Sequence, residues 1–310
     1  MTTRAHVNIG LTKYWGKQSD QINLPTTNTI GLTLDNFYTE TKVVIDDTLK
    51  NDVYLLDDKL LKSDKVEQVL HYFKNKYQIN HFYNIQSKNF VPYAAGFASS
   101  ASSFAALAAA LFQVENINAT TDQIAELARI GSGSAPRSIL SGFTYWNGKH
   151  LEQILAPDDF SIMIIDVLLT KEQKEISSTL GMTLAQQSPD YQNWVEQTNT
   201  SSLAMIEAIT DGDLPKLGQL AEANSLAMHQ LNRELGTNSF DYFTEETFQV
   251  IQTVKELREQ RNLPIYLTID AGPNPKIITN SESKAVIEEF FGQKQLNFAY
   301  PLKGQGIIYE

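Results

Sequence analysis

Cysteine is absent from the 310 residues of the chain. Its absence excludes disulfides, iron–sulfur clusters and thiolate zinc sites, and it favours a cytoplasmic protein. Long hydrophobic runs are lacking as well, since none approaches the ~20 apolar residues of a membrane span. The first residues lead into no long apolar core with a small-residue cleavage site, so we expect no secretory signal. The histidines follow no metal-ligand spacing: His6, His71, His81, His150 and His229.

Positive charge is scarce. The chain has 25 Lys and Arg residues against 36 Asp and Glu residues, which gives a net charge of −11. We do not expect so acidic a chain to bind nucleic acid or an anionic membrane. It can still bind acidic metabolites where its cations gather locally. The candidate sites are therefore the stretches in which Lys or Arg stands beside glycines and hydroxyls.

Hydrophobic residues make up 42% of the chain and charged residues 20%, as in ordinary globular proteins. A chain of this length suggests two closely joined domains. Alternating segments predict several strands before the first long helices, and three amphipathic helices are predicted at 193–209, 213–231 and 245–261. This order favours an α+β layout over repeated βαβ units. We expect the domains to cover 1–176 and 177–310.

The stretch from Val91 to Leu107, V-P-Y-A-A-G-F-A-S-S-A-S-S-F-A-A-L, predicts a loop and then a helix that begins near Ser99. A helix start presents unpaired backbone N–H groups and the positive end of the helix dipole. Small side chains let a phosphate approach that backbone, and the serine hydroxyls can donate to phosphate or ligate magnesium. The alternative is a small-residue helix packed in a core. The pattern matches neither the Walker loop nor the dinucleotide-binding loop.

Two lysines and one arginine stand in settings that suit anion binding. Lys13 and Lys17 bracket Tyr14-Trp15-Gly16, and a tryptophan in a turn usually packs on something and fixes its neighbours. Arg137 follows G-S-G-S-A-P, where a guanidinium can grip a carboxylate or a phosphate with two hydrogen bonds. The alternatives are a turn with solvated lysines and a flexible linker. We predict an anion site at each stretch.

Asp270 follows a short apolar strand at 263–269 and precedes Ala-Gly-Pro-Asn. A carboxylate at the tip of a buried strand can be held rigidly at the floor of a cleft. It can equally be an aspartate that shapes a turn. The local pattern leaves both roles open.

Four stretches together, K-Y-W-G-K, P-Y-A-A-G-F-A-S-S-A, G-S-G-S-A-P-R and D-A-G-P-N, closely resemble the mevalonate diphosphate decarboxylase family. That family belongs to the superfamily of small-molecule kinases named for galactokinase, homoserine kinase, mevalonate kinase and phosphomevalonate kinase. The resemblance covers 7–275. It implies a two-domain α+β fold, with an N-terminal domain like ribosomal protein S5, a ferredoxin-like C-terminal domain and the site between them.

The resemblance also implies an activity. Mevalonate diphosphate and ATP would be the substrates, with Mg²⁺ as cofactor. Isopentenyl diphosphate, carbon dioxide, ADP and phosphate would be the products, as in the mevalonate pathway of isoprenoid biosynthesis. A homodimer is the expected assembly.

Single residues receive roles by the same resemblance. The expected catalytic residues are Asp270, Lys13, Arg137 and Lys174. Substrate contacts are expected from Tyr14, Lys17, Ser132, Ser134 and Met182. The ATP-binding loop would comprise Tyr93, Ala94, Ala95, Gly96, Ala98, Ser99, Ser100 and Ser102. The hydroxyls expected to bind Mg²⁺ are those of Ser99 and Ser100.

The chain departs from the usual family pattern at several positions. It has Thr27-Asn28-Thr29 where the family commonly has N-S-S, Tyr93 where the family has Thr, Phe97 where it has Leu, Pro136 where it has Cys or Ala, and Gln18 where it commonly has Arg. These changes bear on the nucleotide pocket and on affinity for the diphosphate. A phosphomevalonate decarboxylase, or a kinase that stops at the phosphorylated alcohol, is therefore an alternative. A non-catalytic metabolite-binding protein is another, although a mere binder gains nothing from a carboxylate beside anionic ligands.

Overall fold

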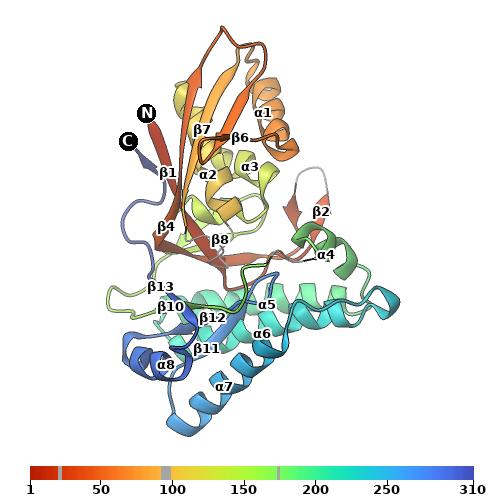
Figure 1. Ribbon diagram of the computed structural model, residues 1–310, viewed down its shortest axis with the longest axis vertical. Coiled ribbons are helices and arrows are strands. Elements are labelled where there is room, and N and C mark those ends of the chain that lie inside the picture. The colour runs from red at the N-terminus through yellow and green to blue at the C-terminus, as the bar shows by residue number, and fades with distance from the viewer. Residues whose placement is uncertain (20–22, 92–98, 173–174) are drawn as a thin grey trace.

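Two stacked units, each built around its own sheet, make up the computed structural model, which describes residues 1–19, 23–91, 99–172 and 175–310 (Figure 1). The larger sheet has the order β14-β1-β4-β7-β5-β6, with β8 paired to β4 and β9 paired to β8. Its strands are β1 (Thr2–Gly10), β4 (Thr29–Ile45), β5 (Val53–Leu56), β6 (Lys59–Leu60), β7 (Tyr83–Phe90), β8 (Phe143–Trp146), β9 (Leu151–Ile154) and β14 (Ile308–Tyr309). A separate hairpin is formed by β2 (Lys17–Ser19) and β3 (Leu24–Pro25).

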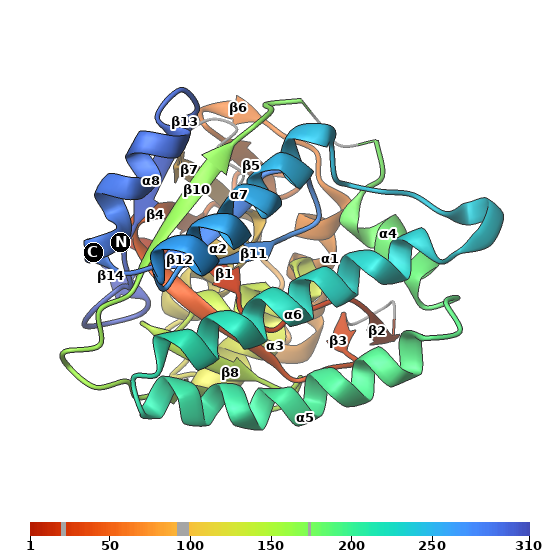
Figure 2. The ribbon, with the colours of Figure 1, turned by 90° about the horizontal axis from the view of Figure 1, so that it is seen from below.

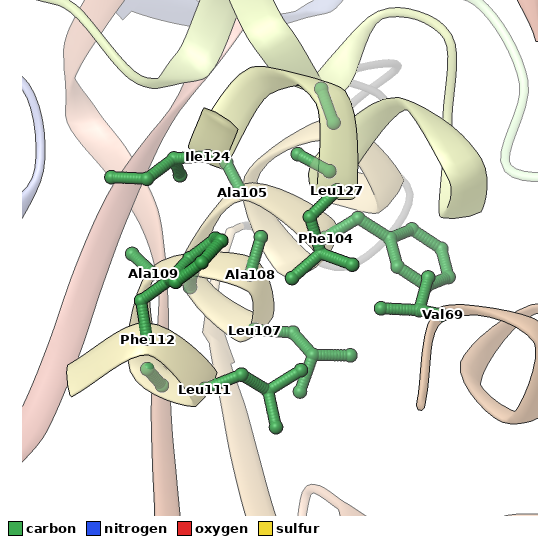
Figure 3. Packing of buried hydrophobic residues seen from close by; sticks show 14 of the residues in the cluster. Val69, Phe104, Ala105, Leu107, Ala108, Ala109, Leu111, Phe112, Ile124 and Leu127 are labelled. Carbon is green, nitrogen blue, oxygen red and sulfur yellow. The ribbon is translucent and has the colours of Figure 1, made fainter. Parts of the chain in front are cut away.

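Three helices share a core with the larger sheet: α1 (Asp64–Tyr77), α2 (Ser99–Val114) and α3 (Thr121–Gly131). Hydroxyl side chains start two of them, since Ser63 accepts a hydrogen bond from Val66 N–H and Thr120 forms a capping box with Gln123. The alanines in the middle of α2 are buried, so α2 lies close against its neighbours (Figure 3). The expected alanine-serine helix thus forms, and it is also a core helix.

The second unit is an antiparallel sheet of four strands in the order β11-β12-β10-β13. Its strands are β10 (Met163–Leu168), β11 (Tyr266–Ile269), β12 (Pro275–Thr279) and β13 (Gln295–Ala299). Its helices are α4 (Ser178–Ala185), α5 (Tyr191–Thr210), α6 (Leu214–Arg233), α7 (Glu245–Arg261) and α8 (Lys284–Phe291). The first strand pairs with both the third and the fourth, which is the ferredoxin-like order. The expected two-domain α+β fold is confirmed.

The two faces of this smaller sheet have different neighbours. On the outer face, Ile165 and Ile277 share a cluster with Val254 of α7 and Ile287 of α8. On the inner face, alternate strand residues such as Ile164 share a cluster with β1, β4, α5 and α6. Figure 2 shows α5, α6, α7 and α8 from the side of the second unit. The inner face is therefore where the two units meet.

The chain crosses between the sheets before the boundary expected at 176/177. The strand β10 lies N-terminal of that boundary, yet it pairs with β12 and β13 of the second sheet. We therefore propose a boundary between β9 and β10. After β13 the chain returns to the first unit, where β14 pairs with β1 and brings the two ends of the chain side by side (Figure 1).

Two elements have distinctive local features. The helix α4 begins where the Ser177 hydroxyl accepts a hydrogen bond from Leu180 N–H. The long strand β4 is continuous, and its pairing with β1 shifts register between His6 and Asn8. Within the described ranges, no helix is both long enough and apolar enough to cross a membrane.

Candidate active site

A cavity of about 450 Å³ lies between the two units and is lined by residues from distant parts of the chain. Its walls include nine residues expected at the site, namely Lys13, Tyr14, Lys17, Ser100, Ser132, Ser134, Arg137, Met182 and Asp270. The structure therefore brings the lysine turn, the start of α2, the Gly-Ser segment and the Asp270 strand tip to one place. Their convergence was expected only from the resemblance.

Asp270, directly after β11, places a carboxylate in this cavity beside Lys13. Lys13 Nζ lies 2.7 Å from Asp270 Oδ1, and Lys276 Nζ lies 3.5 Å from Asp270 Oδ2. Burial opposes ionisation of this carboxyl, but the charges of Lys13, Lys276 and Arg137 outweigh it and hold the pKa of Asp270 well below its usual range. Asp270 is therefore an anion at physiological pH, with part of its side chain open to the cavity.

Lys13 is fixed from several sides although it stands in a turn. Its Nζ donates to Gly10 O at 2.9 Å, and its backbone N–H donates to Asn224 Oδ1 of α6 at 2.8 Å. Burial lowers the pKa of the Lys13 ammonium, and the adjacent Asp270 carboxylate opposes that shift. Trp15, two residues after Lys13, is buried, and its Nε1 donates to Asn232 Oδ1 at 3.2 Å. The tryptophan thus fixes the lysine turn, as the sequence predicted.

Arg137 is held in a short 3₁₀ helix (Ala135–Ser138), where Pro136 takes an early helical position as expected. Its Nε donates to Asn8 Oδ1 at 3.0 Å. Burial lowers the pKa of the guanidinium to about 10, against the opposing charge of Asp270. Among the described residues, buried Arg137 Nη1 has no hydrogen-bond partner, which suits a ligand oxygen from the cavity.

The Gly-Ser segment packs directly against the lysine turn. Ser132 Oγ and Ser134 Oγ are 3.2 Å apart. A Cβ added to Gly133 would lie 2.1 Å from Tyr14 Cζ, so the glycine is needed for the tyrosine ring to reach this position. The Tyr14 hydroxyl donates to Asn23 O at 3.1 Å. Hydroxyls from two distant segments therefore line one wall.

Two serines of α2 have different environments. Ser100 lines the cavity. Ser102 does not, because its side chain is fully buried, lies 2.8 Å from Thr39 Oγ1 and donates to Ser99 O at 3.0 Å. Ser102 therefore ties the helix start to the sheet, and its expected role in ATP binding stays a prediction. Ser99 is not among the lining residues, and its expected role stays a prediction.

Other expected site residues lie outside the described ranges. They are Tyr93, Ala94, Ala95, Gly96 and Ala98 of the loop, and Lys174.

The cavity also contains residues that the sequence did not single out. Asn8 orients Arg137, and Lys65 and Gln68 extend the wall along the first turn of α1. Lys276 lies outside the cavity lining and contacts Asp270 Oδ2. A signal existed for Lys276, which is a lysine inside the apolar strand P-K-I-I-T. No comparable local signal marks Asn8, because an asparagine near a strand end has many uses.

The arrangement defines a class of protein: a two-domain α+β enzyme whose cleft binds an acidic small molecule beside one fixed carboxylate. Two family models match the chain. One describes a diphosphomevalonate decarboxylase-like N-terminal domain, at residues 5–154, and the other a mevalonate 5-diphosphate decarboxylase C-terminal domain, at residues 163–299. The chain belongs to the diphosphomevalonate decarboxylase family, as its four stretches indicated.

Individual relatives agree with this assignment. The diphosphomevalonate decarboxylase of Candida albicans is 30% identical, over 88% of this chain and 82% of its own. The phosphomevalonate decarboxylase of Haloferax volcanii is 27% identical, over 93% of this chain and 90% of its own.

Solved structures match over almost the whole chain. The crystal structure of mevalonate diphosphate decarboxylase from Staphylococcus aureus has a TM-score of 0.92 and 35% identity, covering 99% of this chain and 96% of that one. The structure of MDDEF in complex with MVAPP, AMPPCP and magnesium has a TM-score of 0.91 and 35% identity, covering 99% of this chain and 97% of that one.

Proposed function

We propose that this protein decarboxylates mevalonate 5-diphosphate to isopentenyl diphosphate, with ATP converted to ADP and phosphate and with release of carbon dioxide. One observation supports this most directly: the anionic Asp270 shares a cavity with Arg137, whose Nη1 is buried and has no hydrogen-bond partner among the described residues. An acidic substrate and a nearby fixed anion are what phosphorylation and decarboxylation of a hydroxy acid require. The family membership points to the same reaction.

Binding would rely on the cations and hydroxyls of the cavity wall. Arg137 can hold the substrate carboxylate, with Lys13 beside it, since a guanidinium offers paired donors in a fixed plane. Lys17, Tyr14 and the serines of the Gly-Ser segment can hold the diphosphate. Met182 is buried in the same wall and gives the carbon skeleton an apolar contact.

Asp270 would act on the tertiary hydroxyl and then on the carbon that bears it. Its free surface can accept a hydrogen bond from the hydroxyl and orient it toward the incoming phosphoryl group. When the phosphate departs, positive charge develops at the tertiary carbon, and a fixed anion stabilises that charge. The carboxylate held by Arg137 then loses carbon dioxide as the double bond forms.

ATP would span two adjoining cavities. The second cavity, about 890 Å³, shares Asp64 and Gln68 with the first and includes Tyr54 and Phe82 in its walls. Aromatic and aliphatic walls suit the base, and Lys65 near the junction suits the phosphates.

Magnesium would supply charge neutralisation at the ATP phosphates. The described residues contain no group of three His, Cys, Asp or Glu that could hold a metal ion. Mg²⁺ on a nucleotide needs few protein ligands, because phosphates and water complete its shell. The Ser100 hydroxyl, on the cavity wall, fits that need, and Ser99 stays a second expected ligand.

The test is a panel of mevalonate, its 5-phosphate and its 5-diphosphate, each with ATP and Mg²⁺, with carbon dioxide and ADP measured together. We expect equal amounts of both products from the diphosphate and none after Mg²⁺ is chelated. A higher kcat/KM with the monophosphate would instead assign the activity of the Haloferax volcanii relative. ADP without carbon dioxide would indicate a kinase, and no substrate-dependent ADP would indicate a binding protein.

The proposal includes a cytoplasmic homodimer. The absence of cysteine fits a cytoplasmic location. Light scattering during size-exclusion chromatography tests the homodimer.

Gly31 of β4 provides a test of Arg137 that leaves the cavity lining unchanged. A Cβ at Gly31 would lie 2.7 Å from Arg137 Cδ and Nε, so Gly31→Ala is expected to displace the guanidinium and raise KM for mevalonate diphosphate about tenfold. Steady-state kinetics measure KM for Gly31→Ala and for the wild type, and an unchanged KM in the variant would contradict this placement of Arg137.

A further inference from the structure

A row of four polar side chains crosses the inner face of the smaller sheet. Asn297 of β13 pairs with Asp166 of β10, Asp166 pairs with Lys276 of β12, and Lys276 pairs with Thr268 of β11. Because each pair is directly opposite in register, the four side chains stand side by side on one face. The row leads to the cavity, since Asp270 follows β11 two residues after Thr268.

Charged contacts join this row to the carboxylate of the active site. Lys276 Nζ lies 3.5 Å from Asp270 Oδ2 and 3.8 Å from Asp166 Oδ1. Asn297 Nδ2 donates to Asp166 Oδ2 at 3.0 Å. Thr268 Oγ1 donates to Gly10 O, the same carbonyl that accepts from Lys13 Nζ. The row thus meets the lysine turn of the other unit.

Stability alone gives little reason for this row. Lys276 and Asp166 have side-chain exposures of 1% and 0%. Removing two charges from water is costly, and apolar replacements of such pairs are often neutral or stabilising. The flanking inner-face residues Ile164 and Ile278 are apolar, so an apolar pair would continue the cluster. A role in orienting Asp270 explains the charges better.

The two lysines hold different oxygens of Asp270. Lys13 contacts Oδ1 and lines the cavity, whereas Lys276 contacts Oδ2 and is not among the lining residues. Together they fix the rotation of the carboxyl group and leave its remaining surface toward the cavity. Lys276 is buried on the inner face of the sheet, between the two units, with a side-chain exposure of 1%.

We propose that Lys276 is a positioning residue that holds Asp270 in its reactive orientation, with Asp166 as its buried counter-charge. The inference deepens the proposed function, on which it rests, by adding two residues that act through Asp270.

The charges around Asp270 support this division of roles. Burial raises the pKa of Asp166 to about 6, with Lys276 and Asn297 opposing the shift. The groups that face Asp270 are Lys13 from the lysine turn, Arg137 from the 3₁₀ helix and Lys276 from β12, and they lower its pKa against burial. Without Lys276, two of these three cations remain, so the Asp270 pKa should rise.

The first test uses no substrate. The protein is labelled with ¹³C at its aspartate carboxyl groups, and the Asp270 signal is assigned by its loss in Asp270→Asn. The pH is then lowered to about 3.5, below the usual aspartate pKa of about 3.9. We expect the Asp270 signal to begin its shift away from the carboxylate position at a higher pH in Lys276→Met than in the wild type. A signal that responds alike in both proteins overturns the proposal.

The second test measures turnover of mevalonate diphosphate. Lys276→Met is expected to lower kcat about tenfold to a hundredfold with little change in KM, because the carboxylate is misplaced while the substrate contacts remain. Lys216→Met, which removes an exposed lysine paired with Glu207, is the matched control and should keep the wild-type kcat.

A double variant separates positioning from folding. Lys276→Met leaves Asp166 buried and unpaired, which can destabilise the fold, whereas Asp166→Asn/Lys276→Met has no unpaired charge in the row. We expect the double variant to regain thermal stability but to keep the low kcat. A double variant with wild-type kcat would show that the pair is structural only. Inactivity of the wild type toward mevalonate diphosphate would reject the proposed function, while the ¹³C titration would still test the positioning of Asp270.

Discussion

Asp270→Asn is expected to lower kcat by about a thousandfold or more while the Kd for mevalonate diphosphate changes little. Asparagine keeps the size of the side chain and can still accept a hydrogen bond, but it has no charge with which to stabilise a cationic transition state. An interaction made chiefly in the transition state affects turnover rather than ground-state binding. Carbon dioxide release gives kcat, and calorimetry gives Kd.

The same substitution should also affect folding stability, because Lys13 and Lys276 would lose the carboxylate that both contact. Thermal unfolding must therefore show that the variant is folded at the assay temperature. Asp159→Asn, in an exposed loop, is the matched control and should behave as the wild type. If folded Asp270→Asn kept kcat within tenfold of the wild type, the role of Asp270 would be wrong.

Arg137→Met should weaken both binding and turnover, unlike Asp270→Asn. We expect the Kd for mevalonate diphosphate to rise about tenfold to a hundredfold, which is what the loss of one or two hydrogen bonds to a charged group would cause. We expect kcat to fall as well, because the substrate carboxylate is no longer aligned for loss of carbon dioxide.

Arg137→Lys distinguishes charge from geometry at this position. It keeps the positive charge but loses the planar pair of donors and the Nε contact to Asn8. We therefore expect only a partial recovery of the Kd by calorimetry. An unchanged Kd in Arg137→Met would show that the substrate carboxylate binds elsewhere.

Much of the candidate site could be predicted from short stretches of sequence. Lys13 stands next to an aromatic residue, Arg137 next to a proline, and Asp270 two residues before Gly272-Pro273, and these residues fix a backbone locally. The resemblance then linked stretches that local patterns cannot connect. The structure brings all three residues to one cavity.

What the sequence could not show depends on pairing between distant strands. Lys276 and Asp166 meet only because β10 and β12 are adjacent in register, although more than a hundred positions separate them in the chain. The boundary proposed between β9 and β10 likewise depends on strand pairing, since the apolar strand β10 has the same local pattern whichever sheet it joins. The direction of the Ser102 hydroxyl also depends on packing, because α2 lies against β4 there.

The return of the chain to the first sheet has a consequence for any half-molecule. The strand β1, whose end leads into the lysine turn, is flanked by β4 on one side and by β14 on the other. A fragment that stopped after β9 would leave a bare edge along β1, and unpaired strand edges promote aggregation. The edge of β1 at Thr3 and Arg4 is thus covered by β14, a strand that the chain forms only after it has built the second sheet.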